Sequence, residues 1–229
     1  KEICKVVLTL LHDPSHDVQA VAVKTLSVLL TTVQQEQVLE IADSLTDQVL
    51  DAKKGELRDV YAIGLRTLVK TTPTTAVANR LLGPGRLLEG IQNGNEEIAL
   101  ACLDILCDLL TYNTVSRQHE AVLHLCLAQL NSQSPVIRKR AGNAIACLST
   151  VLTDPLLQRM VEALLQQMDE TSDRQTLIRT LCAVAGAVGH RLGQAQIDRI
   201  LPIFLKFTNP AEATTEDHEE MDDNLNELR

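Results

Sequence analysis

The sequence predicts an all-α protein in which about five to six helix pairs stack side by side as a solenoid. Three observations support this prediction: an aliphatic composition, a repeat of about 40 residues, and apolar residues spaced as on one helix face. Of the 229 residues, 45% are apolar but only 2% are aromatic, and Trp is absent. Aliphatic side chains of this kind favour the packing of helix against helix, whereas strands are richer in aromatic and β-branched residues.

The repeat is marked by five segments in which an aliphatic anchor opens an apolar run, as in HDVQAVAVKTL and GELRDVYAIGL. Successive anchors are 39, 41, 39 and 40 residues apart: Val18, Leu57, Ile98, Ile137 and Leu177. A second amphipathic stretch lies between successive anchors, which makes each unit a helix pair. Since one pair cannot enclose a core, the pairs must stack, and this period with two helices per unit favours HEAT repeats.

The period divides the chain into units at roughly 1–32, 33–72, 73–113, 114–152 and 153–193, followed by a first helix at 194–208. Within the third unit, LGPGR at 82–86 should break or shorten the first helix. An acidic insert at 209–225 is expected to be either a solvated loop or a flexible arm for a basic partner. NELR at 226–229 repeats GELR and predicts the start of another helix, so we expect the natural protein to be longer.

The distribution of charge argues against nucleic-acid binding. Residues 211–229 hold eight acids and one base, a net of −7 of the total −9, which leaves −2 for the rest. Residues 1–210 therefore carry no net positive charge to neutralise phosphates and almost no aromatic side chains on which bases could stack. The sequence contains no run of about 18 apolar residues, so no membrane-spanning helix is predicted.

The six cysteines lie in apolar helical patterns and are expected to be buried free thiols in a reducing compartment. They are Cys4, Cys102, Cys107, Cys126, Cys147 and Cys182. We expect no catalytic, cofactor or metal site, because the cysteine and histidine spacings fit neither a chelate nor a catalytic dyad on a helix.

Basic residues at the starts of second helices are the candidate partner-binding residues. Arg58 has two possible roles: a ladder bond to acidic or carbonyl groups of the adjoining turn, or contact with a partner. Arg138, Lys139 and Arg140 occupy the equivalent place two units later, and three consecutive charges cover more than half a helical turn. At least one of them should therefore face outwards. Arg191 follows a helix end, where it and its neighbouring histidine can cap carbonyls or contact a partner.

Three segments resemble cullin-associated, neddylation-dissociated proteins, which are long HEAT solenoids that regulate cullin-RING ubiquitin ligases. They are ELRDVYAIGLRTLV, VIRKRAGNAIACL and LIRTLCAVAGAVGHRLGQAQIDRILPIFLKF. The GHRLG element at 189–193, with the helix that follows it, is the most specific match. The resemblance covers nearly the whole chain and maps to the amino-terminal part of the family. It fails at residues 83–85 and in the acidic stretch near the end.

The resemblance implies a non-catalytic scaffold of the cytoplasm and nucleus. It would bind an unmodified cullin and its RING subunit at the RING-bound end, obstructing the lysine that accepts the ubiquitin-like modifier. Substrate-receptor exchange would need carboxy-terminal repeats, on this polypeptide or on a separate HEAT-repeat chain. The alternatives are a HEAT scaffold of another kind, such as a nuclear-transport receptor or phosphatase scaffold, or an enzyme with its catalytic centre elsewhere. The residues expected to contact the partner are Arg58, Arg138, Lys139, Arg140 and Arg191.

Overall fold

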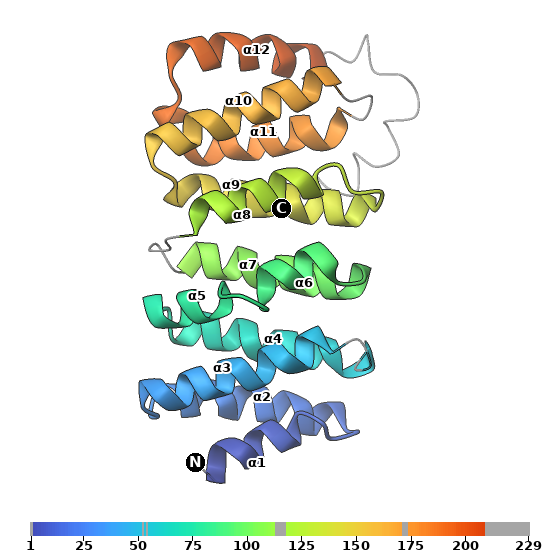
Figure 1. The fold of residues 1–229 in the computed structure, drawn as a ribbon, viewed down its shortest axis with the longest axis vertical. Helices are drawn as coiled ribbons and strands as arrows, with labels where there is room; N and C mark the ends of the chain where they lie inside the picture. Colours follow the sequence, from blue (N-terminus) through green and yellow to red (C-terminus); the bar gives the residue numbers. More distant parts are fainter. Residues whose placement is uncertain (1, 52, 54, 113–117, 171–173, 209–229) are drawn as a thin grey trace.

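The computed structural model describes residues 2–51, 53, 55–112, 118–170 and 174–208 (Figure 1). All of its regular structure within these ranges is helical. The first helices of the successive units are α1 (Glu2–Leu10), α3 (Gln35–Leu50), α5 (Thr75–Leu81) with α6 (Leu87–Asn93), α8 (His119–Gln129), α10 (Asp154–Glu170) and α12 (Gln194–Thr208). The second helices are α2 (His16–Leu30), α4 (Gly55–Thr71), α7 (Glu96–Tyr112), α9 (Pro135–Val151) and α11 (Gln175–Val188), with the 3-10 turn η1 (Gly189–Arg191) after α11.

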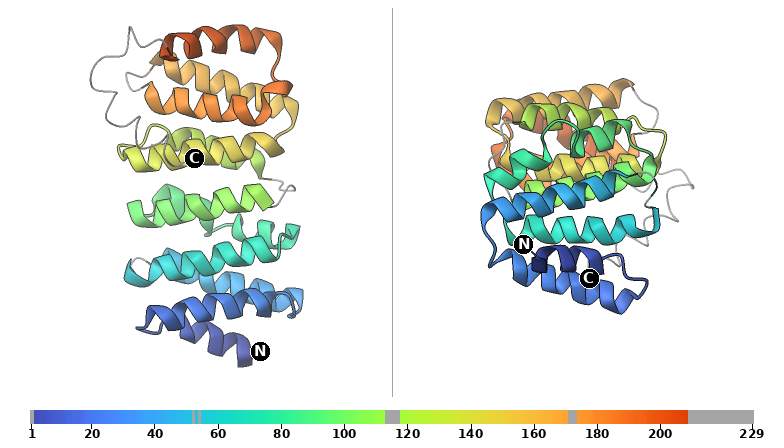
Figure 2. Two further views of the ribbon diagram at one scale, coloured as in Figure 1. Left: turned by 180° about the vertical axis from the view of Figure 1, so that it is seen from behind. Right: turned by 60° about the horizontal axis from the view of Figure 1, so that its bottom comes forward.

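The helices form two layers that run the length of an elongated stack. The first helices lie in front in Figure 1, and the second helices are in front when the molecule is turned round (Figure 2). Along the second-helix layer, α2 packs on α4, α4 on α7, α7 on α9 and α9 on α11. This arrangement confirms the predicted all-α HEAT-repeat solenoid. The predicted insert at 209–225 and helix start at 226–229 lie outside the described residues.

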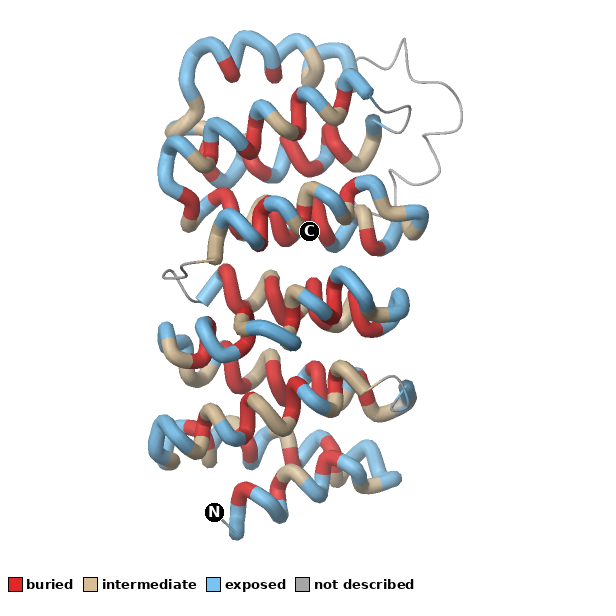
Figure 3. Tube along the Cα trace, in the orientation of Figure 1, coloured by how far each residue is buried: buried red, intermediate tan, exposed pale blue. Residues whose placement is uncertain are grey.

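The core is one continuous apolar layer between the two sets of helices. Buried positions recur along the inner face of each unit, while the outer surfaces are largely exposed (Figure 3). Each of the five second helices α2, α4, α7, α9 and α11 contributes a leucine with 0% exposure. These are Leu26, Leu65, Leu106, Leu148 and Leu181. The α9 and α11 helices pack closely, since a Cβ on Gly142 would lie 2.4 Å from Thr180 Oγ1. Each unit therefore shares its core with its neighbours, as a solenoid requires.

Local signals explain where several helices begin. Ser134 caps α9, since its hydroxyl accepts a hydrogen bond from the Ile137 amide at 3.3 Å, and Pro135 occupies the first helical position. The helix of the third unit is interrupted as the sequence predicts, because α5 ends at Leu81 and α6 begins at Leu87. Gly85, within the break, has a φ of 71°, a conformation that favours glycine.

Candidate partner-binding surface

Arg58 is one of the largest fully buried side chains that the structure describes, with an exposed fraction of 2%. Its Nε donates to the carbonyl of Val49 at 3.2 Å, and its Nη2 donates to the carbonyl of Asp51 at 3.2 Å. Its Nη1 also forms an ion pair with Glu97 Oε2, 2.5 Å away, at the start of the next second helix. These contacts favour the ladder role over partner contact, because the guanidinium ties the end of α3 to both α4 and α7.

The residue directly after the anchor has the same structural role in two other units. Arg138 Nη1 donates to the carbonyls of Ser132 at 2.9 Å and Gln133 at 3.1 Å in the loop between α8 and α9. Gln19 Nε2 donates to the carbonyl of Asp13 at 2.8 Å in the loop between α1 and α2. A long polar side chain after the anchor thus satisfies carbonyls that the preceding helix end and loop leave without a donor.

Lys139 and Arg140, in contrast, are exposed on α9. The Arg140 side chain is 46% exposed and forms a 3.2 Å ion pair with Asp104 of α7. Lys139 forms no salt bridge within the part of the chain that the structure describes. At least one charge of the basic triplet therefore faces solvent, as its spacing predicts.

Arg191 joins two units rather than capping its own helix. Its Nη2 donates to the carbonyl of Leu152 at 2.6 Å, and its Nη1 donates to the carbonyl of Ser149 at 3.3 Å, at the end of α9. The same guanidinium forms a 2.7 Å ion pair with Asp154 at the start of α10. His190 is exposed beside it. The cation thus lies at the carboxyl end of a helix, where the dipole favours positive charge, but the helix is that of the preceding unit.

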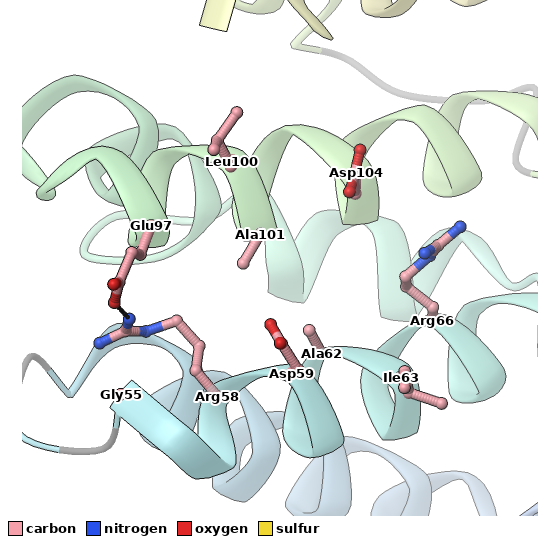
Figure 4. A pocket seen from close by; sticks show the side chains of 10 residues that line it. All are labelled: Gly55, Arg58, Asp59, Ala62, Ile63, Arg66, Glu97, Leu100, Ala101 and Asp104. Carbon is pink, nitrogen blue, oxygen red and sulfur yellow. Dashed lines mark hydrogen bonds and ion pairs between the residues drawn. The ribbon is translucent and has the colours of Figure 1, made fainter. Parts of the chain in front are cut away.

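A shallow groove of about 490 Å³ runs between α4 and α7 (Figure 4). The Arg58–Glu97 pair lies at one end of it, Arg66 lies at the other, and Asp59 points towards α7 between them. The lining residues are Gly55, Arg58, Asp59, Ala62, Ile63, Arg66, Glu97, Leu100, Ala101 and Asp104. Within this lining, Ile63 is 50% exposed, which gives the groove an apolar edge.

Asp104 and Asp108, one turn apart on α7, pair with basic residues of the neighbouring helices beside this groove. Asp108 accepts from Arg66 Nε at 2.5 Å and lies 3.4 Å from Lys70 Nζ, both on α4. Burial raises the pKa of the Asp104 carboxyl, and the charges of Arg140 and Arg66 partly offset this effect. These carboxylates therefore connect α7 to the helix on either side of it.

A second set of ion pairs connects the first helices, and the sequence-based interpretation missed it. Asp43 of α3 pairs with Arg80 on one side of the helix break and, at 3.1 Å, with Arg86 on the other. The remaining pairs are Asp47–Arg86 at 2.6 Å, Glu120–Arg159 at 2.7 Å and Glu162–Arg199 at 2.5 Å. Apart from the Asp43–Arg86 pair, the partners are 37 to 39 residues apart, close to one repeat period. A search for opposite charges separated by one period would have found them.

The cysteines do not all fit the prediction of buried free thiols. Cys4, Cys102 and Cys126 are buried, Cys107 and Cys147 are partly exposed, and Cys182 is exposed. The burial prediction is therefore wrong for Cys182, because it occupies the outer face of α11, opposite the buried Leu181 and Val184. Within the described ranges, no group of three or more potential ligand side chains could hold a metal ion. No described helix combines the length and apolar character needed to cross a membrane.

Comparison with known proteins gives matches along most of the chain, although no family model matches it. Cullin-associated NEDD8-dissociated protein 2 of Rattus norvegicus is 34% identical over 224 residues, which cover 91% of this chain and 17% of the relative. Cullin-associated NEDD8-dissociated protein 1 of Dictyostelium discoideum is 31% identical over 216 residues, 87% of this chain and 17% of the relative. The Arabidopsis thaliana protein of the same name is 28% identical over 224 residues, 94% of this chain and 18% of the relative. The chain thus spans less than a fifth of the length of these relatives, and it belongs to the cullin-associated NEDD8-dissociated protein family.

Proposed function

We propose that this chain is a non-catalytic binding module that contacts a cullin and its RING subunit. The observation that carries the proposal is the similarity, over 87% to 94% of the chain, to proteins named for their association with cullins. The similarity extends across the solenoid and is not confined to one helix pair. The partner would therefore contact several units at once, as extended solenoid surfaces allow.

The contact surface that we propose is the outer side of the second-helix layer around α7 and α9. Arg58, Arg138 and Arg191 bond to carbonyls of the solenoid itself, so their guanidinium groups have structural work in the free protein. Lys139 and Arg140 are the exposed cations of the candidate set. Cations of this kind set the register and the rate of association, while buried apolar area supplies most of the affinity.

The proposed mechanism is occlusion and requires no chemistry by this chain. A solenoid lying against the RING-bound end of an unmodified cullin covers the lysine that accepts the ubiquitin-like modifier. The conjugating enzyme then cannot reach that lysine. Exchange of substrate receptors belongs to carboxy-terminal repeats beyond this chain, on the same or a separate polypeptide, and the complex acts in the cytoplasm and nucleus.

Size-exclusion chromatography with a purified cullin–RING complex tests this proposal. The chain should co-elute with the unmodified complex and not with the complex that already carries the modifier. It should also slow modification of the cullin when it is added to a reconstituted reaction. Equal binding to both forms would contradict occlusion, and binding to neither would favour a HEAT scaffold of another kind.

Two double charge-reversal variants, one in each helix layer, test where the cullin-contact surface lies. The double variant Lys139→Glu and Arg140→Glu should weaken cullin binding by about tenfold or more, because it reverses two exposed charges at the proposed interface. The matched control reverses Arg159 and Arg199, which are half-exposed and ion-paired in the first-helix layer. Both variants should keep the helical content of the wild type, measured by circular dichroism. Equal loss of binding in the control would remove the support for the second-helix surface.

A further inference from the structure

The groove between α4 and α7 contains a carboxylate that the fold itself does not use. Asp59 is exposed near the start of α4 and points towards α7 (Figure 4). It forms no hydrogen bond or ion pair among the described residues, whereas Glu97 and Asp104, the other carboxylates of the lining, pair with arginines. The groove therefore holds one acidic group that has no cation beside it in the described structure.

The other charges of the lining favour a further cation. The groove is lined by three carboxylates and two guanidinium groups, and one of these guanidinium groups, that of Arg66, is paired with Asp108 outside the lining. The Asp104 side chain is only 26% exposed, and its burial raises the pKa of its carboxyl against the opposing charges of Arg140 and Arg66. A cation bound in the groove would offset this desolvation, because an opposite charge favours the ionised carboxyl.

The apolar part of the lining suits the stem of a long cationic side chain. Ile63 is 50% exposed and Leu100 is half-buried. Ala62 and Ala101 lie between α4 and α7 and keep the space of about 490 Å³ open, because their side chains are single methyl groups. Arginine and lysine bury such stems on apolar surface while the charged end reaches its partner. Arginine fits better, because its planar guanidinium offers several donors to carboxylates and because interfaces are enriched in arginine and depleted in lysine.

We propose that this groove receives an arginine side chain of the cullin–RING partner, with the guanidinium on Asp59 and the methylene stem against Ile63 and Leu100. This inference rests on the proposed function, which supplies the partner, and it extends the contact surface from α9 to α4. The surface then presents two exposed cations, Lys139 and Arg140, together with a carboxylate that awaits a cation. Charges of both signs at separate places fix the register of a partner more strictly than one sign alone.

Two variants test the groove by different means, in calorimetric titrations with the purified unmodified cullin–RING complex. Asp59→Asn removes the charge but keeps the shape, and it should weaken binding by about tenfold or more because the partner's guanidinium loses its carboxylate. Ala101→Met keeps every charge but fills the space, and it should weaken binding to a similar extent. The matched control, Asp17→Asn, removes an exposed carboxylate in the first turn of α2, outside the groove, and should bind as the wild type does. All three variants should keep the helical content of the wild type, measured by circular dichroism.

Phenylglyoxal, which modifies arginine and not lysine, identifies the side chain in the groove. The complex is treated with it in the presence of saturating wild-type chain or saturating Asp59→Asn, and the modified arginines are mapped by peptide mass spectrometry. One partner arginine should be protected by the wild type and should react again with Asp59→Asn, while the protection of other arginines stays the same.

Three results would overturn this assignment, and they separate it from the proposed function. If the wild-type chain does not bind the complex, the proposed function fails and this occupant fails with it. If the wild type binds and either Asp59→Asn or Ala101→Met binds equally well, the groove alone is excluded. If the wild type protects a partner lysine from acetylation but protects no arginine from phenylglyoxal, the choice of arginine is wrong.

Discussion

Replacing Arg58 with Met tests whether the buried guanidinium holds neighbouring units together. Methionine keeps an unbranched, apolar side chain of similar reach but donates no hydrogen bonds. The carbonyls of Val49 and Asp51 therefore lose their donor at the end of α3, and Glu97 loses its cation. This one substitution therefore removes contacts from α4 to both the end of α3 and the start of α7.

The expected loss follows from the burial of each partner. Val49 has 0% exposure, so its carbonyl has no access to water and costs about 1–3 kcal/mol when left unsatisfied. Asp51 is half-buried, so water can replace the donor there at a cost of about 1 kcal/mol. The Glu97 side chain is 70% exposed, which limits the ion pair to about 0–1 kcal/mol. We expect Arg58→Met to lower the free energy of unfolding by about 2–5 kcal/mol.

Urea unfolding followed by circular dichroism measures this loss, with Glu97→Gln as the matched control. Glu97→Gln removes the ion pair but leaves both carbonyl bonds, so it should cost less than about 1 kcal/mol. Arg58→Lys keeps the charge but lacks the planar fork and should fall between the two. Equal losses in Arg58→Met and Glu97→Gln would refute the reasoning, because the ion pair would then account for the whole effect.

The remaining predictions concern packing and titration. Gly142→Ala should destabilise the protein by about 1–3 kcal/mol, since its Cβ would press on Thr180, and Thr180→Ala in the same chain should restore part of the loss in urea unfolding. Tyr61→Phe should be neutral or slightly stabilising in thermal unfolding, because the Tyr61 hydroxyl is buried without a hydrogen-bond partner among the described residues; a large loss would reveal a partner. The hydrogen bond from Arg80 lowers the pKa of Asp43 below its ordinary value of 3.8. The ionised Asp43 carboxylate should therefore contribute its full stabilisation above pH 3.8 and lose it as the pH falls through the lowered pKa. The free energies of unfolding of Asp43→Asn and wild type should differ at pH 7 and converge in acid.

Most of the fold was predictable because it depends on local pattern. The five anchors all lie within the first turns of the second helices, since an apolar stripe with a period near 3.6 can bury itself in only one helical orientation. The break at residues 82–86 was predictable for a similar reason, because glycine and proline act on their own backbone. Neither inference needs knowledge of distant residues.

The roles of the basic residues were not predictable from the same pattern. Arg58 and Arg138 each follow a repeat anchor by one position and bond to carbonyls of the preceding helix end or loop, whereas Lys139 follows its anchor by two positions and is exposed. Which of these positions meets the carbonyls depends on the path of the preceding loop, which only the packing of the helix pair decides.

The broken helix of the third unit carries a consequence for engineering the chain. Arg80 precedes the break and Arg86 follows it, and both hold Asp43 of α3. Each half of the interrupted helix is therefore fastened to the same neighbour by its own charge. The peptide between them needs only to connect the halves, which makes residues 83–85 a suitable place to insert a protease site, a fluorophore attachment point or a short epitope without separating the units on either side.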